Sequence, residues 1–179
     1  MTNAEFAILS LIIEKSRHGY EIEQVIEERG MREWTEIGFS SIYYLLRKLE
    51  QDGYVNGRIE QQAGRGPARK VYQATPNGRK AYHQATLDAL ATPYTSYNPL
   101  LLGLANLPTV SLEEALTALN HHQEGLSERL ARVQARRDEQ RPLPDFVEAM
   151  FDYSLTMITA EIEWLEKCRN QLERTHEQN

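Results

Sequence analysis

Residues 40–48 carry the side chains of this sequence best suited to contact a charged polymer. Hydroxyl, phenol and cationic groups alternate there with apolar ones, and the polar set is Ser40, Ser41, Tyr43, Tyr44, Arg47 and Lys48. Small hydroxyls at the start of a helix let it approach a phosphate backbone, where its free amide groups favour an anion. An arginine one or two turns further on reaches guanine edges in the major groove of DNA. The same pattern also describes a solvated amphipathic helix with tyrosines packed on its neighbours.

A basic loop follows this segment. Its cations are Arg65, Arg69 and Lys70, which flank Gly64, Gly66 and Pro67. Glycines let a backbone come close to a ligand, and the cations suit phosphates or a minor groove. Solubility alone would explain an isolated basic loop. A basic loop shortly after a basic helix, in a chain of net charge −6, favours nucleic acid.

The charge of the chain is unevenly distributed. Residues 1–36 hold 4 basic and 8 acidic side chains, residues 37–82 hold 8 and 3, and residues 83–179 hold 8 and 15, which gives −4, +5 and −7. Phosphate contact and counterion release act over about a Debye length, so a local positive segment is sufficient for DNA. We therefore expect residues 37–82 to contact double-stranded DNA.

Other chemistry finds little support. No catalytic set is found, and we expect no enzyme activity, no cofactor and no metal site. His121 and His122 are adjacent on an expected helix, so they point about 100° apart and cannot chelate one ion as an i, i+4 pair does. The one cysteine, Cys168, excludes an internal disulfide and agrees with a reducing compartment. Since neither a signal peptide nor an apolar run of about 20 residues is found, the expected location is the cytoplasm.

The elements that must position the basic residues follow from periodicity and caps. Gly30 and Gly53 are typical residues to end helices, and Thr75 followed by Pro76 is typical of a helix start. Ile42, Leu45, Leu46 and Leu49 give the third helix a buried face. The expected order is helices at 4–15, about 20–29 and about 40–52, a hairpin of strands at 54–60 and 69–75, and a helix from 76 to about 91. This order predicts a winged helix-turn-helix with a two-stranded wing in residues 1–91.

The second half is expected to be helical. Residues 92–110 form an apolar connector with a short helix, because they are too apolar for a free linker. Ser111 and Glu114 form a capping box ahead of a helix over about 112–140, and a last helix covers about 145–174. The fold class is therefore mainly α, with a helical dimerisation domain in residues 111–179.

Each of the two long helices carries one apolar seam with steps of three and four residues, broken once, by Gln123 on the first helix and by Arg169 on the second. On the last helix this seam is Phe151, Leu155, Ile158, Ile162, Leu165 and Leu172. Two such seams can pair within one chain as a hairpin, or one can take up a helix of a second chain. We favour dimerisation through this seam, because a small basic reading domain usually gains specificity from a second copy.

Aromatic side chains in the second half indicate a possible ligand site. Tyr94, Tyr97 and Trp164 could line a cavity for a small aromatic effector. For Trp164, packing at the dimer contact is the favoured role, and lining such a cavity with Tyr94 or Tyr97 is the alternative.

Three runs of the sequence resemble the PadR family of transcriptional regulators. They are AILSLI with HGYEI (residues 7–12 and 18–22), SSIYYLLRKLEQDGYV (40–55) and GRGPARKVYQATPNGRKA (64–81). Their order and spacing agree with the family across residues 7–81. The two long helices resemble the longer branch of the family, whose last helices dimerise.

The resemblance implies a homodimer that binds a palindromic operator in the bacterial nucleoid, usually as a repressor released by a phenolic acid or a planar aromatic drug. It places Tyr20 at the start of the second helix, where either a contact with the DNA backbone or packing under the helix turn is expected. Many relatives carry glycine or proline in place of Ser40 and proline in place of Tyr44, so the base contacts of this helix need not be theirs. The alternative is a winged helix that binds protein, which the acidic second helix supports best.

Overall fold

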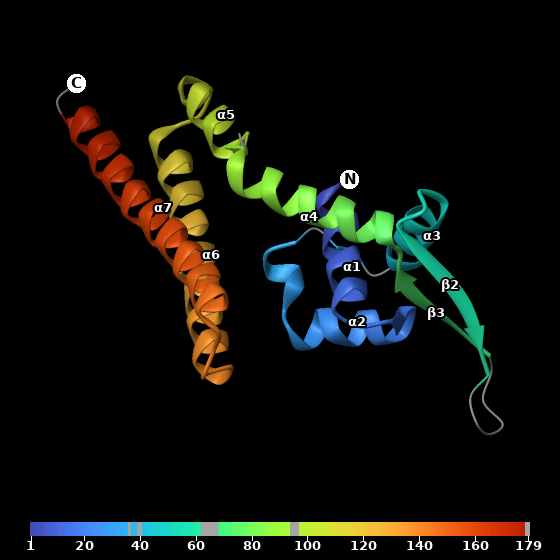
Figure 1. The fold of residues 1–179 in the computed structure, drawn as a ribbon. Helices are drawn as coiled ribbons and strands as arrows, with labels where there is room; N and C mark the ends of the chain where they lie inside the picture. Colours follow the sequence, from blue (N-terminus) through green and yellow to red (C-terminus); the bar gives the residue numbers. More distant parts are fainter. Residues whose placement is uncertain (36, 39–40, 62–67, 94–96, 178–179) are drawn as a thin grey trace. The chain divides into compact units, whose positions relative to one another are not determined.

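The computed structural model describes residues 1–35, 37–38, 41–61, 68–93 and 97–177. The chain divides into two compact units, Met1–Thr95 and Ser96–Asn179. Figure 1 follows the elements along the chain, from α1 to α4 with the small sheet in the first unit to α5, α6 and α7 in the second.

Helix α1, Asn3–Glu14, begins at a reciprocal cap. The Thr2 hydroxyl accepts the Glu5 N–H, and the Glu5 carboxylate accepts the Thr2 N–H. This exchange satisfies amide groups that a helix start leaves without intrahelical partners. Ile8, Leu9 and Ile12 of α1 are fully buried, so this helix lies at the centre of the first core.

Two other helices of the first core are each followed by a glycine, as predicted. They are α2, Gly19–Glu28, and α3, Ile42–Gln51, and the short η1, Met31–Glu33, comes between them. Gly30 follows α2 with φ 59°, and Gly53 follows α3 with φ 72°. Both glycines occupy the left-handed region, where a side chain would be strained. The turns after both helices therefore require glycine.

The sheet has one strand more than the sequence predicts. Its strands are β1, Arg17–His18, β2, Val55–Glu60, and β3, Arg69–Ala74, in the order β1–β3–β2, all antiparallel. The hairpin of β2 and β3 is the predicted wing (Figure 1). We interpreted the stretch around His18 as an interruption between helices, because two residues carry no alternation of apolar and polar side chains.

Helix α4, Pro76–Ala91, begins at the predicted Thr75–Pro76 cap. The Thr75 hydroxyl accepts the Gly78 N–H at 2.9 Å and donates to the Gly53 carbonyl at 2.7 Å. A Cβ atom on Gly78 would overlap the backbone carbonyl of Tyr54. The run Thr75–Gly78 therefore fixes the start of α4 against the turn that joins α3 to the wing.

The second unit is a helical hairpin with a short helix before it. Its elements are α5, Pro99–Ala105, η3, Leu107–Thr109, α6, Leu112–Glu139, and α7, Asp145–Glu177. The predicted capping box starts α6, since the Ser111 hydroxyl accepts the Glu114 N–H at 3.2 Å. At the other end of α6, Arg137 pairs with Glu148 of α7 at 2.7 Å.

The predicted seam of α7 packs against α6 of the same chain. Leu119, Leu126 and Val133 of α6 form one cluster with Ile158 and Leu165 of α7, and Phe151, Leu155, Ile162 and Leu172 pack against it. Leu165 is fully buried. The intramolecular hairpin, which the sequence left open beside dimerisation, therefore uses the face that we assigned to the dimer. A second chain could reach this face only if the hairpin opened.

Candidate nucleic-acid interface

Helix α3 has one buried and one exposed face. Ile42, Leu45, Leu46 and Leu49 are buried, as the periodicity predicts. Tyr43, Tyr44 and Arg47 are exposed on the surface of the helix. Arg47 makes no hydrogen bond or ion pair with a described residue. Tyr43, Tyr44 and Arg47 are named the reading face below.

Lys48 lies at the edge of this face and is held by a carboxylate. Its ammonium pairs with Glu5 of α1, whose side chain is only 5% exposed. Burial raises the pKa of Glu5, but the hydrogen bonds from Lys48 and from the Thr2 N–H outweigh it and hold the pKa below its ordinary value. Removal of Lys48 from Glu5 would leave a buried carboxylate without its cation. Lys48 therefore has a structural partner that the sequence pattern does not reveal.

Glu50 connects α3 to both strands of the wing. Its carboxylate accepts the Gly57 N–H of β2 at 3.1 Å and the Lys70 ammonium of β3 at 2.6 Å. The hydrogen bond from Lys70 lowers the pKa of Glu50, burial opposes this effect, and the Gly57 N–H adds to it. A Cβ atom on Gly57 would collide with the Lys70 and Glu50 side chains. Glu50 is thus a positioning residue for the wing, and Lys70 is engaged by it.

His18 joins the start of α2 to the wing. Its Nδ1 accepts the Glu21 N–H at 3.2 Å, and the Glu21 carboxylate accepts the His18 N–H at 2.9 Å, which forms a capping box. Its Nε2 lies 3.1 Å from Nη1 of Arg69 in β3. A neutral imidazole has one unprotonated nitrogen, so His18 accepts from Glu21 or from Arg69 but not from both. Tyr20, 60% exposed, stacks on His18 with ring centroids 6.4 Å apart.

Arg58 belongs to this group, although the sequence reasoning missed it. His18 and Arg58 are both paired with Val71 in the sheet register, so all three share one face, which Arg69 shares by alternation. Arg58 is exposed, and its side chain makes no hydrogen bond or ion pair in the described part of the chain. The alternation of β2, with Val55 buried and Asn56 exposed, could have revealed it. His18, Arg58 and Arg69 are named the outer face of the sheet below.

Some predicted contact residues lie outside this description. Ser40, Arg65 and Tyr94 are not among the described residues. Ser41 precedes α3, but its hydroxyl donates to the Gly38 carbonyl at 2.6 Å and makes no cap to the helix. We expected a serine hydroxyl at the helix start to approach phosphate. For Ser40 this stays a prediction, and the Ser41 hydroxyl is bonded to the loop before the helix instead of capping it.

The two remaining effector candidates, Tyr97 and Trp164, are exposed side chains of the second unit. Tyr97 is 90% exposed and Trp164 43%. The residue after Tyr97, Asn98, donates to Glu161 of α7 at 3.3 Å, which places the start of α5 one helical turn from Trp164 along α7. Neither ring lines the polar pocket of this unit.

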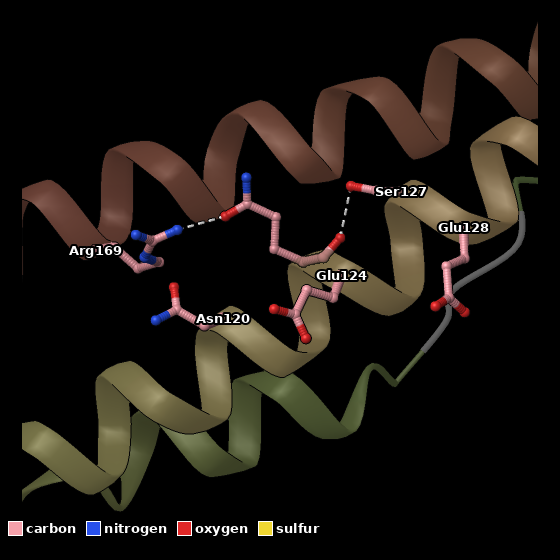
Figure 2. A pocket seen from close by; sticks show the side chains of 6 residues that line it. Asn120, Glu124, Ser127, Glu128 and Arg169 are labelled. Atoms are coloured by element: carbon pink, nitrogen blue, oxygen red, sulfur yellow. Dashed lines mark hydrogen bonds between the residues drawn. The ribbon is translucent and has the colours of Figure 1, made fainter.

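A pocket of the second unit lies elsewhere and is polar. It has a volume of about 520 Å³ and is lined by Asn120, Gln123, Glu124, Ser127, Glu128 and Arg169. Figure 2 shows Arg169 on one helix and Asn120 and Glu124 on the other. Arg169 of α7 donates to the Gln123 side-chain oxygen of α6 at 2.6 Å. These two residues are the breaks in the apolar seams of the hairpin. The lining offers charges and amides but no ring, so it does not suit an aromatic effector.

The described residues contain neither a candidate membrane span nor a candidate metal site. None of their helices combines the length and apolar character that crossing a bilayer requires. No three of their His, Cys, Asp or Glu side chains group closely enough to hold a metal ion.

Residues 8–84 match the model of the Transcriptional regulator PadR-like family. Among curated proteins, none matches the sequence.

Solved structures are similar over nearly the whole chain. Bacillus subtilis PadR in complex with operator DNA is 22% identical, with a TM-score of 0.77, and the match covers 94% of this chain and 98% of that one. PadR of the same organism in complex with p-coumaric acid is 21% identical, with a TM-score of 0.75 and coverages of 96% and 99%. A PadR-like transcriptional regulator from Bacillus cereus is 20% identical, with a TM-score of 0.69 and coverages of 96% and 97%. These likenesses establish the fold, a winged helix-turn-helix followed by two long helices.

Proposed function

Because the chain belongs to the PadR-like family of transcriptional regulators, we propose that it is a repressor that binds a palindromic operator as a homodimer and is released by a small aromatic compound. The observation that carries DNA binding is the reading face of α3, where two tyrosines are exposed beside an arginine whose side chain has no partner among the described residues. This face lies in the one segment of the chain with a positive charge, residues 37–82.

Helix α3 enters the major groove in this proposal. Arg47 contacts a base edge, because its guanidinium has no partner to leave among the described residues. Tyr43 and Tyr44 contact bases or the adjacent backbone, and Tyr20 contacts a phosphate from the start of α2. Ser40 and Ser41 stay in the contact set as backbone contacts.

The wing supplies contacts to phosphates. Arg58 and Arg69 are the stronger candidates, since neither is held by a carboxylate in the described residues. Arg65 remains a proposed contact of the wing tip. Lys48 and Lys70 must each leave a carboxylate to contact phosphate directly. They therefore contribute to the positive electrostatic potential near the DNA and make no direct contact with it.

Dimerisation uses the exposed side of α7 in this proposal. Phe146, Met150, Tyr153, Met157 and Trp164 follow one another at steps of four, three, four and seven residues, and each is between 41% and 70% exposed. They form a second seam, about 27 Å long, on a different face from the hairpin seam. A soluble monomer rarely leaves such a patch uncovered, and a second copy covers it symmetrically.

The effector part rests on Tyr94, Tyr97 and Trp164. Trp164 belongs to the exposed seam, and Tyr97 lies beside Asn98, whose side chain contacts α7 one turn away. An aromatic ligand near Trp164 would alter how two copies of α7 pair. The complex of Bacillus subtilis PadR with p-coumaric acid supports a phenolic acid as the first compound to try.

Selection of DNA from a randomised pool with the full-length protein tests operator binding. We expect a palindrome whose half-sites lie about one helical turn, 34–36 Å, or a multiple of it apart. A reporter driven by the selected duplex should be less active when the protein is present. If no sequence is enriched, the reading function is wrong. If a single half-site is enriched, the dimer is wrong.

Titration with p-coumaric acid and planar aromatic cations tests the effector. In a Trp34→Phe background, Trp164 is the one remaining tryptophan, and its fluorescence should be quenched in parallel with the loss of operator binding. Tenfold release needs about 1.4 kcal/mol of differential affinity for the free form. Quenching without release of the operator would show that the compound binds near Trp164 but does not regulate DNA binding. If neither signal responds, the protein is controlled by its abundance or by a protein partner.

A further inference from the structure

Gly19 lies where the ring of Tyr43 crosses the start of α2. A Cβ atom on Gly19 would lie 2.6 Å from Cε1, 3.0 Å from Cζ and 3.2 Å from Cδ1 of Tyr43, and these are its three nearest atoms. Atoms at such distances overlap, so any side chain at residue 19 would displace the ring.

Backbone conformation does not explain this glycine. Among the described glycines, Gly30 and Gly53 have a positive φ and Gly19 does not. At the first position of a helix, alanine would be favoured over glycine by helix propensity. The close approach of Tyr43 is therefore what requires a residue without a side chain.

We propose that Gly19 is a positioning residue for Tyr43, and that Tyr43, held in this way, discriminates between DNA sequences. The proposal rests on the proposed operator binding and assigns the base-reading role within it. Tyr43 remains 56% exposed, so part of its ring is available to a ligand while its edge lies on Gly19.

Contact with Gly19 restricts the rotamers of an otherwise exposed side chain. A tyrosine on a free helix surface loses rotamer freedom when it binds, which lowers affinity. Tyr43 has lost that freedom before DNA arrives. It is also the second residue of α3, and the first turn of a recognition helix is the part that contacts base edges. Tyr44 is a matched comparison, because it is 59% exposed and has no ring contact or hydrogen bond with the described residues.

A double-mutant cycle on the full-length protein tests the proposal. The probes are the duplex that wild-type protein selects from a randomised pool and a scrambled duplex, at one salt concentration. Gly19→Ala and Tyr43→Ala should each lower the ratio of the two affinities about tenfold, and the double variant should lower it no further. Gly19→Ala should keep its full effect in a Tyr44→Ala background.

Thermal unfolding separates positioning from loss of the fold. In the Tyr43→Ala background Gly19→Ala should raise Tm, because alanine restricts the unfolded chain and no longer meets the ring. Equal losses on both duplexes, or the same loss with and without Tyr43, would overturn the inference while operator binding stands. If wild-type protein selects no sequence, the proposed function itself fails and Tyr43 has no sequence to read.

Discussion

The cations of the first unit differ in whether a carboxylate already holds them. Lys48 pairs with buried Glu5 and Lys70 with Glu50, whereas Arg47 and Arg58 have no hydrogen bond or ion pair among the described residues. A cation that must leave a carboxylate gains less from a phosphate, since one charge-assisted hydrogen bond replaces another. Removal of either arginine should therefore lower the affinity for DNA most directly.

Arg47→Ala should separate base reading from general attraction. We expect a loss of about 1–3 kcal/mol in binding free energy on the selected operator and little change on random DNA. Competition titrations with both duplexes measure the difference. Equal losses of affinity for the operator and for random DNA would show that Arg47 contacts the DNA backbone and not a base.

Arg58→Ala should change how binding depends on salt. If Arg58 contacts one phosphate, the slope of log affinity against log salt should become shallower by about one unit for every sequence. Lys70→Ala should change the slope by less, because Glu50 already neutralises Lys70. The opposite ranking would mean that Lys70 leaves Glu50 in the complex and that Arg58 faces away from DNA.

At the scale of elements, one carboxylate joins α3 to both strands of the wing, beside the core that they share. Glu50 accepts from Gly57 of β2 and from Lys70 of β3, so it joins three elements. Hydrogen bonds to a charged group are stronger than neutral ones, and partial exposure weakens them. The ionised state of Glu50 therefore contributes to the stability of the contact between α3 and the wing.

Glu50→Gln should lower stability at neutral pH and not in acid. The hydrogen bond from Lys70 holds the pKa of Glu50 below its ordinary value of 4.5. The ionised group therefore stabilises the fold fully above pH 4.5, and this contribution is lost as the pH falls through the lowered pKa. We expect a deficit of about 1 kcal/mol at pH 7 that shrinks towards pH 3. Urea unfolding in a Trp164→Phe background, where Trp34 reports on the first unit, measures it.

Glu60→Gln is the matched control for this experiment, since Glu60 lies on the same wing and its side chain makes no hydrogen bond or ion pair in the described residues. It should unfold like wild type at both pH values. A Glu50→Gln deficit of the same size in acid would show that packing, and not charge, is what the substitution removes.

Local signals in the sequence predicted most elements but not their partners. Helix caps and glycines, such as Thr75 and Gly53, act within one turn, so sequence alone located them. Strand β1 was missed because two residues have no period, and its pairing with β3 brings together segments more than fifty residues apart. The ion pair of Lys48 with Glu5 was missed because it joins two residues that are 43 positions apart in the sequence.

At the scale of the whole chain, a helical period does not say which copy of the chain covers a seam. The sequence located Phe151, Leu155, Ile158, Ile162, Leu165 and Leu172 as an apolar seam, and the structure packs them against α6 of the same chain. The exposed seam contains Met157 and Trp164. Between them, the helical positions 160 and 161 carry Ala160 and Glu161 instead of a large apolar side chain, so the apolar period is interrupted there. That interruption hid the second seam behind the stronger one.

Three glutamate substitutions on α7 distinguish the two seams. Met157→Glu places a charge on the exposed seam, where a monomer tolerates it but a dimer contact would bury it unpaired, at several kcal/mol. We expect a folded, monomeric chain whose operator affinity collapses. Leu165→Glu puts the charge into the fully buried hairpin contact and should lower helix content as well. Thr159 is exposed and belongs to neither seam, so Thr159→Glu should behave as wild type. Sedimentation and circular dichroism measure both properties. A Met157→Glu chain that stays dimeric would remove the exposed seam from the interface and require that the hairpin opens to form the dimer.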